Sequence, residues 1–371
     1  MLESIPAWMD LAGVPGLAMA VVEHDRVAWS ANFGVTNSST RAPVTDDSLF
    51  EAASMSKAVF AYAVLQLVQA GTLSLDRPLV EYHRPAYLPN DARIDRITVR
   101  HVLSHTSGLP NWGDDGKPDT LKPAFDPGTR FRYSGEGIFW LQLVVERITR
   151  QGLDAFVRTT LFDPAGMRNS AFTLDESMVS RLVHGHSDGR PDNGHGTRGV
   201  LSMIAPRATT WGIPLRAWRH EEWLRAAAEL DPGNPARRVR FANAASSMLT
   251  TAQDYARFLQ IVASRTSSQP WMLRDRERDA MLTPIMPVRP GSALAWGLGW
   301  NVERQGEVDR CGHEGNNNGR FTAYSGIERS SDCGSGRALV ILANAAGGFA
   351  VYQRIVRAVT GSDQLSFLAS L

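Results

Sequence analysis

The sequence contains few of the residues that would indicate a disulfide framework or a membrane span. Its 371 residues include two cysteines, Cys311 and Cys333, and no apolar run of about 20 residues that could cross a bilayer. We interpret the cysteines as ordinary thiols, with a single bridge as the alternative. The first residues, MLESIPAWMD, have neither the basic nor the apolar region of a signal peptide. We expect a soluble protein, cytoplasmic as given, or periplasmic or secreted if a signal peptide has been removed.

An excess of charge of either sign is also missing. Lys plus Arg number 39 and Asp plus Glu 38, so the net charge is +1. Such a balance argues against the basic surface of a nucleic-acid-binding protein. No repeat of about 20–50 residues indicates a solenoid. Hydrophobic residues make up 43% of the chain, which is enough for a large buried core, and nothing in the composition indicates the oligomeric state.

Lysine is the scarcest charged residue. Among the 39 basic residues only Lys57, Lys117 and Lys122 are lysines. Lys57 follows Ser54 by three positions in the stretch FEAASMSKAVFAYAVLQ, whose apolar spacing predicts a mostly buried helix over residues 54–70.

The Ser54–Lys57 spacing has a chemical interpretation. Residues i and i+3 share a helix face, and a buried lysine can lose its proton, whereas arginine stays protonated. The pair therefore predicts a serine nucleophile with an amine base. A serine at a helix start is more often only an N-cap, and the motif alone leaves that alternative open.

Two further motifs carry possible chemistry. Tyr133-Ser134-Gly135 lies where an extended segment meets a helix predicted for residues 135–149, and a phenol there can relay protons. His313-Glu314-Gly315 lies at the start of the C-terminal strands, where a glycine allows close approach of a substrate to an edge strand. A backbone N–H on that strand can contribute to an oxyanion hole. Each motif alone is weak, because a packed tyrosine or an ordinary turn explains it equally well.

In this order, the three motifs resemble those of the serine β-lactamase and penicillin-binding-protein superfamily. The chain is most similar to class C β-lactamases and to their relatives among esterases, D-aminopeptidases and acyltransferases. Segments such as ITVRHVLSHTSGLPNW, PGTRFRYSGEGIFWLQLVVERIT and GHEGNNNGRFTAYSG also look like family segments. The resemblance covers most of the chain except residues 185–240.

The resemblance implies a two-step acyl transfer without metal or cofactor. Ser54 would be the acylated nucleophile, Lys57 its general base or proton store, and Tyr133 the group that passes a proton to the leaving group. Whether Lys57 or Tyr133 is the acylation base stays open. The oxyanion hole would be formed by the backbone N–H groups of Ser54 and Asn316.

The expected binding residues depart from the family pattern at two positions. His313 and Gly315 would line the cleft, but His313 stands where penicillin-recognising enzymes usually have Lys, and a histidine binds a carboxylate more weakly at neutral pH. Gly135 replaces the family's Asn, and we hypothesise that Glu136 or water supplies the missing contact. Both departures favour an esterase, amidase or acyltransferase over an efficient β-lactamase. We also expect Trp112 to line the cleft.

The predicted fold is α+β in a single β-lactamase-like catalytic domain over residues 1–371. An antiparallel sheet would be built from both chain ends (1–75 and 290–371) and flanked by helices, with a mainly helical part (76–289) inserted. The expected sheet elements are a hairpin over 16–34 and strands at 295–302, 320–328 and 338–343. We predict a long insertion at 185–240 with one helix near 219–229, whose tryptophans could form an apolar lid.

The predicted function is a serine hydrolase acting on a small ester or amide. An acyltransferase or a D-aminoacyl peptidase using the same site is the alternative, and a penicillin-binding sensor that is acylated but barely turns over is another. A metal site at His184, His186 and His195 is the remaining alternative. The glycines and prolines between these residues give no fixed geometry, so we interpret the segment as a solvated loop.

Overall fold

The computed structural model describes residues 1–114, 117–192, 197–233, 240–264, 269–305, 308–330, 337–361, 363 and 366. Within these ranges, no helix is both long and apolar enough to cross a membrane.

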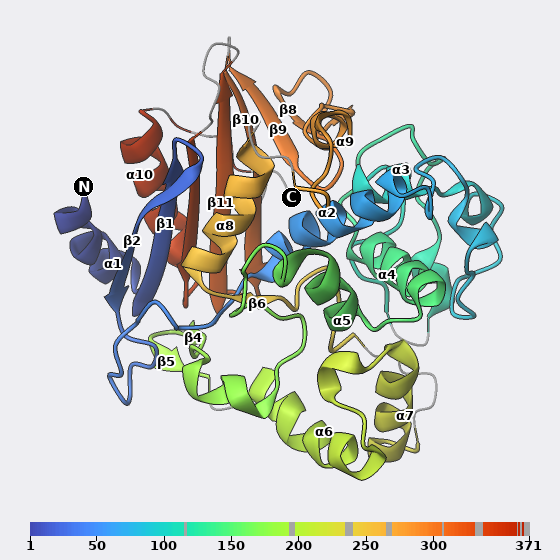
Figure 1. Cartoon of the computed structure of the whole chain (residues 1–371), viewed down its shortest axis with the longest axis horizontal. Helices are drawn as coiled ribbons and strands as arrows, with labels where there is room; N and C mark the ends of the chain where they lie inside the picture. Colours follow the sequence, from blue (N-terminus) through green and yellow to red (C-terminus); the bar gives the residue numbers. More distant parts are fainter. Residues whose placement is uncertain are drawn as a thin grey trace.

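An antiparallel sheet forms one half of the molecule (Figure 1). The strand order is β2-β1-β12-β11-β10-β9-β8-β7. The strands are β1 (Gly16–Glu23), β2 (Arg26–Gly34), β7 (Met286–Pro287), β8 (Leu294–Trp296), β9 (Asn301–Gln305), β10 (Val308–Asn317), β11 (Phe321–Ser330) and β12 (Arg337–Ala343). β1 pairs with β2 on one side and with β12 on the other, both antiparallel. The α+β fold with a sheet built from both chain ends is thereby confirmed.

Helices cover both faces of this sheet, as alternation along a strand requires. Ala18, Ala20 and Val22 of β1 belong to the larger core, whereas Leu17, Met19 and Val21 belong to a second core on the opposite face. Helix α8 (Ala252–Ala263) packs on the first face. Helices α1 (Ile5–Ala12) and α10 (Gly348–Thr360) pack on the other.

Helix α2 (Ser56–Gln69) joins the sheet to the helical half of the molecule (Figure 1). Its first ten residues, through Leu65, are buried on all sides, in agreement with the predicted buried helix. The remaining helices of this half are α3 (Val99–Leu103), α4 (Gly135–Thr149), α5 (Leu153–Val157), which continues as a π-helical turn (Arg158–Phe162), and α9 (Asp275–Met281). The Ser134 hydroxyl caps α4 by accepting a hydrogen bond from the Gly137 N–H at 2.9 Å.

A short two-stranded sheet connects the segment before α2 to a distant loop. Strand β3 (Phe50–Glu51) pairs antiparallel with β6 (Leu249–Thr250). This pairing brings the Ser54 segment against residues 243–248, which lie almost 200 positions later in the chain.

The insertion is more ordered than the sequence predicted. It contains β4 (His186–Ser187), β5 (Arg190–Pro191), α6 (Thr197–Trp211) and α7 (His220–Leu230). Helix α7 matches the one predicted helix, but α6 was missed, because Gly199 and Pro206 lie inside it and both disfavour a helix interior. Trp211 stacks on Trp218, and Trp218 meets Trp223 edge to face, with ring centroids 5.0 Å apart in each pair; all three belong to a small core between the insertion and its neighbours.

The strand predicted at 295–302 is two short strands, β8 and β9. Between them the chain turns at Gly299, which has a φ of 86°. A Cβ on Gly299 would lie 2.4 Å from the Cβ of Ala61 on α2, so the turn packs directly against that helix. A local apolar pattern cannot reveal a contact with a distant helix. The run at 295–302 therefore predicts one continuous strand.

Candidate active site

Ser54 lies on a tight turn, not in the helix itself. A 3₁₀ turn (Ala53–Met55) precedes α2, and Ala53 has a φ of 47°, in the left-handed region that non-glycine residues rarely adopt. Such strain costs about 1–3 kcal/mol and is found most often at functional sites. The sequence predicted Ser54 in the first helical turn. The turn still leaves its hydroxyl within reach of Lys57.

Lys57 projects from the first turn of α2 toward this hydroxyl. Its Nζ lies 3.1 Å from Ser54 Oγ and 2.7 Å from the backbone carbonyl oxygen of Ala245. Lys57 is only 2% exposed, and its burial lowers its pKa from 10.5 to about 7. About half of the amine is therefore neutral, and able to accept a proton, at neutral pH.

The Tyr133 ring lies beside the same amine. Lys57 Nζ is 4.7 Å from the centre of the ring. Burial raises the pKa of Tyr133, and a hydrogen bond with Ser54 opposes this effect. Tyr133 is therefore a neutral phenol at physiological pH, beside the serine and the lysine.

His313 is a buried, uncharged residue of β10. Its Nδ1 lies 2.7 Å from the carbonyl oxygen of Glu314, so Nδ1 carries the proton and donates it. Burial first, and the charge of Lys57 second, lower the pKa of His313 to about 3. The sequence predicted weaker carboxylate binding by this histidine, and the structure goes further, because His313 carries no positive charge at neutral pH.

Gly315 brings the edge of β10 against the nucleophile turn. A Cβ added there would lie 2.6 Å from the Ala52 carbonyl oxygen and 3.2 Å from the Ser54 nitrogen. Only glycine allows this approach of two backbones. The next residue, Asn316, directs its side chain to its own hairpin by accepting a hydrogen bond from the Gly319 N–H at 2.8 Å.

Glu136 and Trp112 are connected to each other through Arg240. The Glu136 carboxylate accepts a hydrogen bond from the Gly113 N–H at 2.9 Å and lies 3.5 Å from the guanidinium of Arg240. That guanidinium in turn covers the Trp112 ring at 4.9 Å. Glu136 therefore holds the loop that carries Trp112.

The structure explains why Gly135 replaces the family asparagine. A Cβ on Gly135 would lie 2.7 Å from the Trp112 ring and 2.8 Å from the Asn111 carbonyl oxygen, so no side chain fits. The contact to Lys57 that we hypothesised for Glu136 is made by the Ala245 carbonyl. Within the described residues, Lys57 donates its two hydrogen bonds to Ser54 and to the Ala245 carbonyl.

Sequence reasoning missed His105, which lies against Tyr133. Its ring centre is 4.3 Å from that of Tyr133 and 4.8 Å from that of Trp296. Its Nδ1 accepts a hydrogen bond from the Ser134 N–H at 3.1 Å, and burial lowers its pKa well below 6.5. The available signal was the HTSG turn of the quoted segment ITVRHVLSHTSGLPNW.

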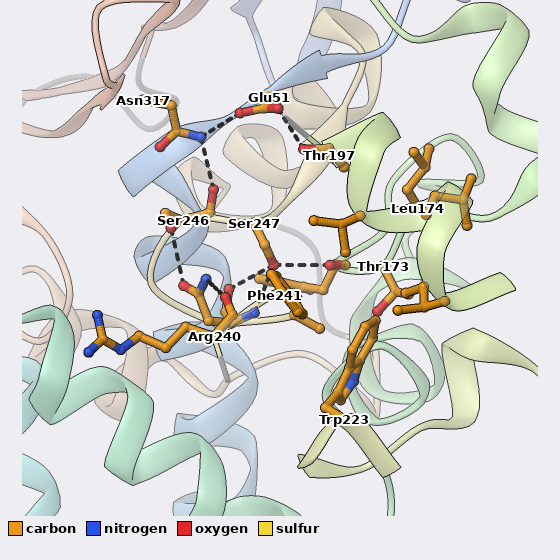
Figure 2. A pocket seen from close by; sticks show the side chains of 16 residues that line it. Glu51, Thr173, Leu174, Thr197, Trp223, Arg240, Phe241, Ser246, Ser247 and Asn317 are labelled. Carbon is orange, nitrogen blue, oxygen red and sulfur yellow. Dashed lines mark hydrogen bonds between the residues drawn. The ribbon is translucent and has the colours of Figure 1, made fainter. Parts of the chain in front are cut away.

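A cavity of about 200 Å³ lies between the insertion and the sheet, and its lining includes Glu51, three residues before Ser54. Figure 2 shows the Glu51 carboxylate at one side, bridging Asn317 of β10 and Thr197 of α6, with 2.7 Å to each. The remaining wall is mixed, with apolar residues (Phe172, Leu174, Val200, Leu201, Ile204, Trp223 and Phe241) and polar ones (Thr173, Arg240, Asn243, Ser246 and Ser247). Ser246 lines the same cavity and follows Ala245, whose carbonyl contacts Lys57, so one loop contributes to both the cavity and the catalytic centre.

The histidines of the insertion are structural where they can be described. His186 Nε2 accepts a hydrogen bond from the Ser38 N–H at 3.1 Å, and its Nδ1 lies 3.2 Å from the Asn344 carbonyl oxygen. In the described part of the chain, no three His, Cys, Asp or Glu side chains are arranged to hold a metal ion. His195 lies outside that part, as does Cys333. Cys311 is a buried free thiol.

Known proteins resemble this chain along most of its length. The family model described as Beta-lactamase matches residues 5–361. Penicillin-binding protein 4 of Amycolatopsis lactamdurans is 27% identical over 371 residues, covering 94% of this chain and 85% of that protein. Esterase EstB of Burkholderia gladioli is 26% identical over 314 residues, covering 77% and 74%. A solved class C β-lactamase has the same fold, with a TM-score of 0.70 at 18% identity over 98% of this chain and 96% of that one.

Proposed function

Because this chain belongs to the β-lactamase family of serine hydrolases, we propose that it hydrolyses a small ester or amide through an acyl-enzyme on Ser54. One observation carries the proposal. A buried lysine, whose pKa burial lowers to about 7, lies 3.1 Å from a serine hydroxyl on a strained turn. A neutral amine at that distance can take the hydroxyl proton as the oxygen attacks a carbonyl carbon.

In the acylation step, Ser54 Oγ forms a bond to the carbonyl carbon and its proton passes to Lys57. The carbonyl oxygen becomes an oxyanion, which the backbone N–H groups of Ser54 and Asn316 stabilise. The bond to the leaving group then breaks, Tyr133 delivers its proton to the departing oxygen or nitrogen, and Lys57 passes the proton that it took to the Tyr133 oxygen, which restores both groups.

In the deacylation step, water attacks the acyl carbon and releases the acid and free Ser54. We assign the first proton transfer of each step to Lys57 and not to Tyr133. Burial lowers the pKa of the lysine and thus favours its basic form, whereas it raises the pKa of the phenol and disfavours the phenolate.

The polar groups beside the site favour substrates without a carboxylate at the strand edge. His313 is neutral, and the charge of Arg240 is already matched by Glu136. A β-lactam carboxylate would therefore find no unmatched cation among these residues, so β-lactam hydrolysis is expected to be weak or absent. The likeness to an esterase in sequence is consistent with this preference.

The adjoining cavity supports an acyl group of limited size. Its volume is about 200 Å³, and a cavity of about 150 Å³ holds a benzene ring. We propose that the acyl part of the substrate enters it, with a short branched chain or a single aromatic ring as the best fit.

Intact-mass measurement and turnover with p-nitrophenyl acetate and nitrocefin test the proposal. We expect multiple turnovers of the ester, little turnover of nitrocefin, and loss of both reactions in Ser54→Ala. The control is Ser56→Ala, because the Ser56 hydroxyl, among the residues that the structure describes, bonds to backbone groups, namely the Ala53 carbonyl and the Met248 N–H. A lasting nitrocefin adduct without ester turnover would instead indicate a sensor. Full activity of Ser54→Ala would remove the proposed nucleophile.

Substrate series then separate the remaining alternatives. With p-nitrophenyl esters from acetate to octanoate and with the benzoate, kcat/KM should be highest for the short branched and aromatic acyl groups and fall for octanoate. D- and L-aminoacyl p-nitroanilides test the peptidase alternative. Added alcohols or amines test acyl transfer, because a transferase would form the new ester or amide faster than the free acid.

A further inference from the structure

Gln142 on α4 clamps a loop that borders the catalytic centre. Its Oε1 accepts a hydrogen bond from the Ala244 N–H at 2.9 Å, and its Nε2 donates to the Ala242 carbonyl at 3.1 Å. Gln142 is buried. Since one backbone group needs an acceptor and the other a donor, the amide has only one orientation that satisfies both. The side chain therefore fixes both sides of the turn at residues 242–244.

The next residue of this loop is the one that contacts the catalytic lysine. The Ala245 carbonyl oxygen lies 2.7 Å from Lys57 Nζ, and the Ala245 N–H donates to Asn243 Oδ1 at 3.0 Å. A primary amine on a four-carbon side chain has many rotamers, so an anchored acceptor is needed to direct its lone pair toward Ser54. The loop supplies that acceptor, and Gln142 sets the position of the loop.

Glu146, one turn further along α4, completes the arrangement. Its Oε1 accepts a hydrogen bond from Gln142 Nε2 at 2.8 Å, and its Oε2 accepts one from the His220 N–H at 2.7 Å. His220 is the first residue of α7 in the insertion. Hydrogen bonds thus connect α7 to α4 and α4 to the 242–245 loop, and the backbone of that loop carries the connection to Lys57.

We propose that Gln142, oriented by Glu146, is a positioning residue for Lys57 and couples helix α7 of the insertion to the catalytic amine. The inference rests on the proposed acyl-enzyme function of Ser54. The coupling gives the insertion a role in the chemical step. This role is separate from any part that the insertion has in enclosing the substrate. Glu146 touches neither Ser54 nor Lys57 in the hydrogen bonds described above, so both residues act through the loop.

The test is Gln142→Met, which keeps the length of the side chain and removes its polar atoms. The matched control is Gln66→Met, because Gln66 on α2 also bonds to backbone, donating to the Thr160 and Trp271 carbonyls at 3.0 and 2.6 Å, away from the site. With p-nitrophenyl acetate we expect Gln142→Met to lower kcat by about 10–100-fold with KM changed by less than about threefold. Gln66→Met should leave kcat unchanged.

The pH profile provides a readout that general destabilisation does not move. Burial is what lowers the pKa of Lys57, and a loosened loop admits water, so the pKa should rise toward 10.5 in Gln142→Met. His105, His313 and Tyr133, which also face the amine, stay neutral near pH 7, and Glu146, whose pKa burial raises to about 7, is taken out of the profile by repeating it in Glu146→Gln. The activity of the variant relative to wild type should therefore be low at neutral pH and below, and should partly recover near pH 9. An unchanged kcat and acid limb in a folded Gln142→Met would overturn the inference.

A second variant keeps the inference testable if Gln142→Met does not fold. Gln142→Glu retains an acceptor for the Ala244 N–H, loses the donor to the Ala242 carbonyl and to Glu146, and places two carboxyl groups together, so a loss of kcat is expected. Wild-type kcat in that variant would count against the inference. If the wild-type protein forms no acyl-Ser54, the proposed function fails. If the wild-type protein turns over substrate and both Gln142 variants match its rate, only the positioning role of Gln142 is refuted.

Discussion

The buried amine of Lys57 predicts that acylation of Ser54 depends on pH with a midpoint near 7. With a pKa of about 7, about half of the amine is neutral at pH 7, against about one part in 3,000 for a lysine with the ordinary value of 10.5. Because only the neutral amine can take the Ser54 proton, the rate should rise as pH increases through about 7 and level off above about 8.

The neighbouring groups do not titrate in this range, with one exception. The pKa values of His105 and His313 are lowered by burial, and that of Tyr133 is raised, so all three stay neutral near pH 7. The exception is Glu146, because its burial raises its pKa to about 7. Glu146→Gln removes that titration, and the acid limb of the profile should persist in this variant at a reduced plateau.

The assay is the pre-steady-state release of p-nitrophenolate between pH 5.5 and 9.5. Lys57→Arg places a permanent cation at the same position, so we expect acylation to fall by about 10²–10⁴-fold, the usual contribution of a general base. A rate that does not vary with pH, or an acid limb that disappears in Glu146→Gln, would refute the assignment to Lys57. Near wild-type acylation by Lys57→Arg would refute it as well.

Further measurements test the same site. Between pH 7 and 10.5 the unfolded chain binds the Lys57 proton that the folded protein has lost, so wild-type stability should rise relative to Lys57→Met by up to about 1.4 kcal/mol per pH unit in urea unfolding. Gly315→Ala should cut kcat/KM by more than about 100-fold, because the added Cβ meets fixed backbone at 2.6 Å, whereas Gly233→Ala, whose Cβ meets only a side-chain oxygen at 3.8 Å, should not. Thr197→Val removes the 2.7 Å hydrogen bond to Glu51 and so loosens the part of the cavity wall that α6 contributes, while the contacts of Lys57 stay intact. We therefore expect KM for branched esters to rise and kcat to stay constant. Equal changes in kcat and KM would count against that division of roles.

Local patterns were sufficient to predict the main elements that hold the site. The apolar run after Ser54 predicted a buried helix, and α2 is buried through Leu65. Ser134 accepts a hydrogen bond as the helix cap of α4, where the sequence predicts that helix to begin. Such predictions succeed because helix periodicity and capping depend on residues within a few positions of one another.

Predictions failed where a distant contact overrode the local pattern. Helix α6 forms despite Pro206 and Gly199, because Leu201 and Ile204 belong to a core that also contains Leu49 and Leu249. The apolar run after Leu294 is broken at Gly299, because the turn there packs against Ala61. Neither partner is near in sequence, so neither outcome could be read from its own segment.

The sequence by itself determined which chemistry is available. A rare lysine three residues after a serine, a tyrosine before α4 and a glycine on a late strand are properties of residue type and spacing. The tertiary structure alone decided how that chemistry is tuned. It buried Lys57, which lowers its pKa, and it placed the Ala245 carbonyl on the amine, with Gln142 holding the loop from a helix about 100 positions away. Burial and hydrogen-bond partners arise from segments distant in the chain, so no local pattern encodes them.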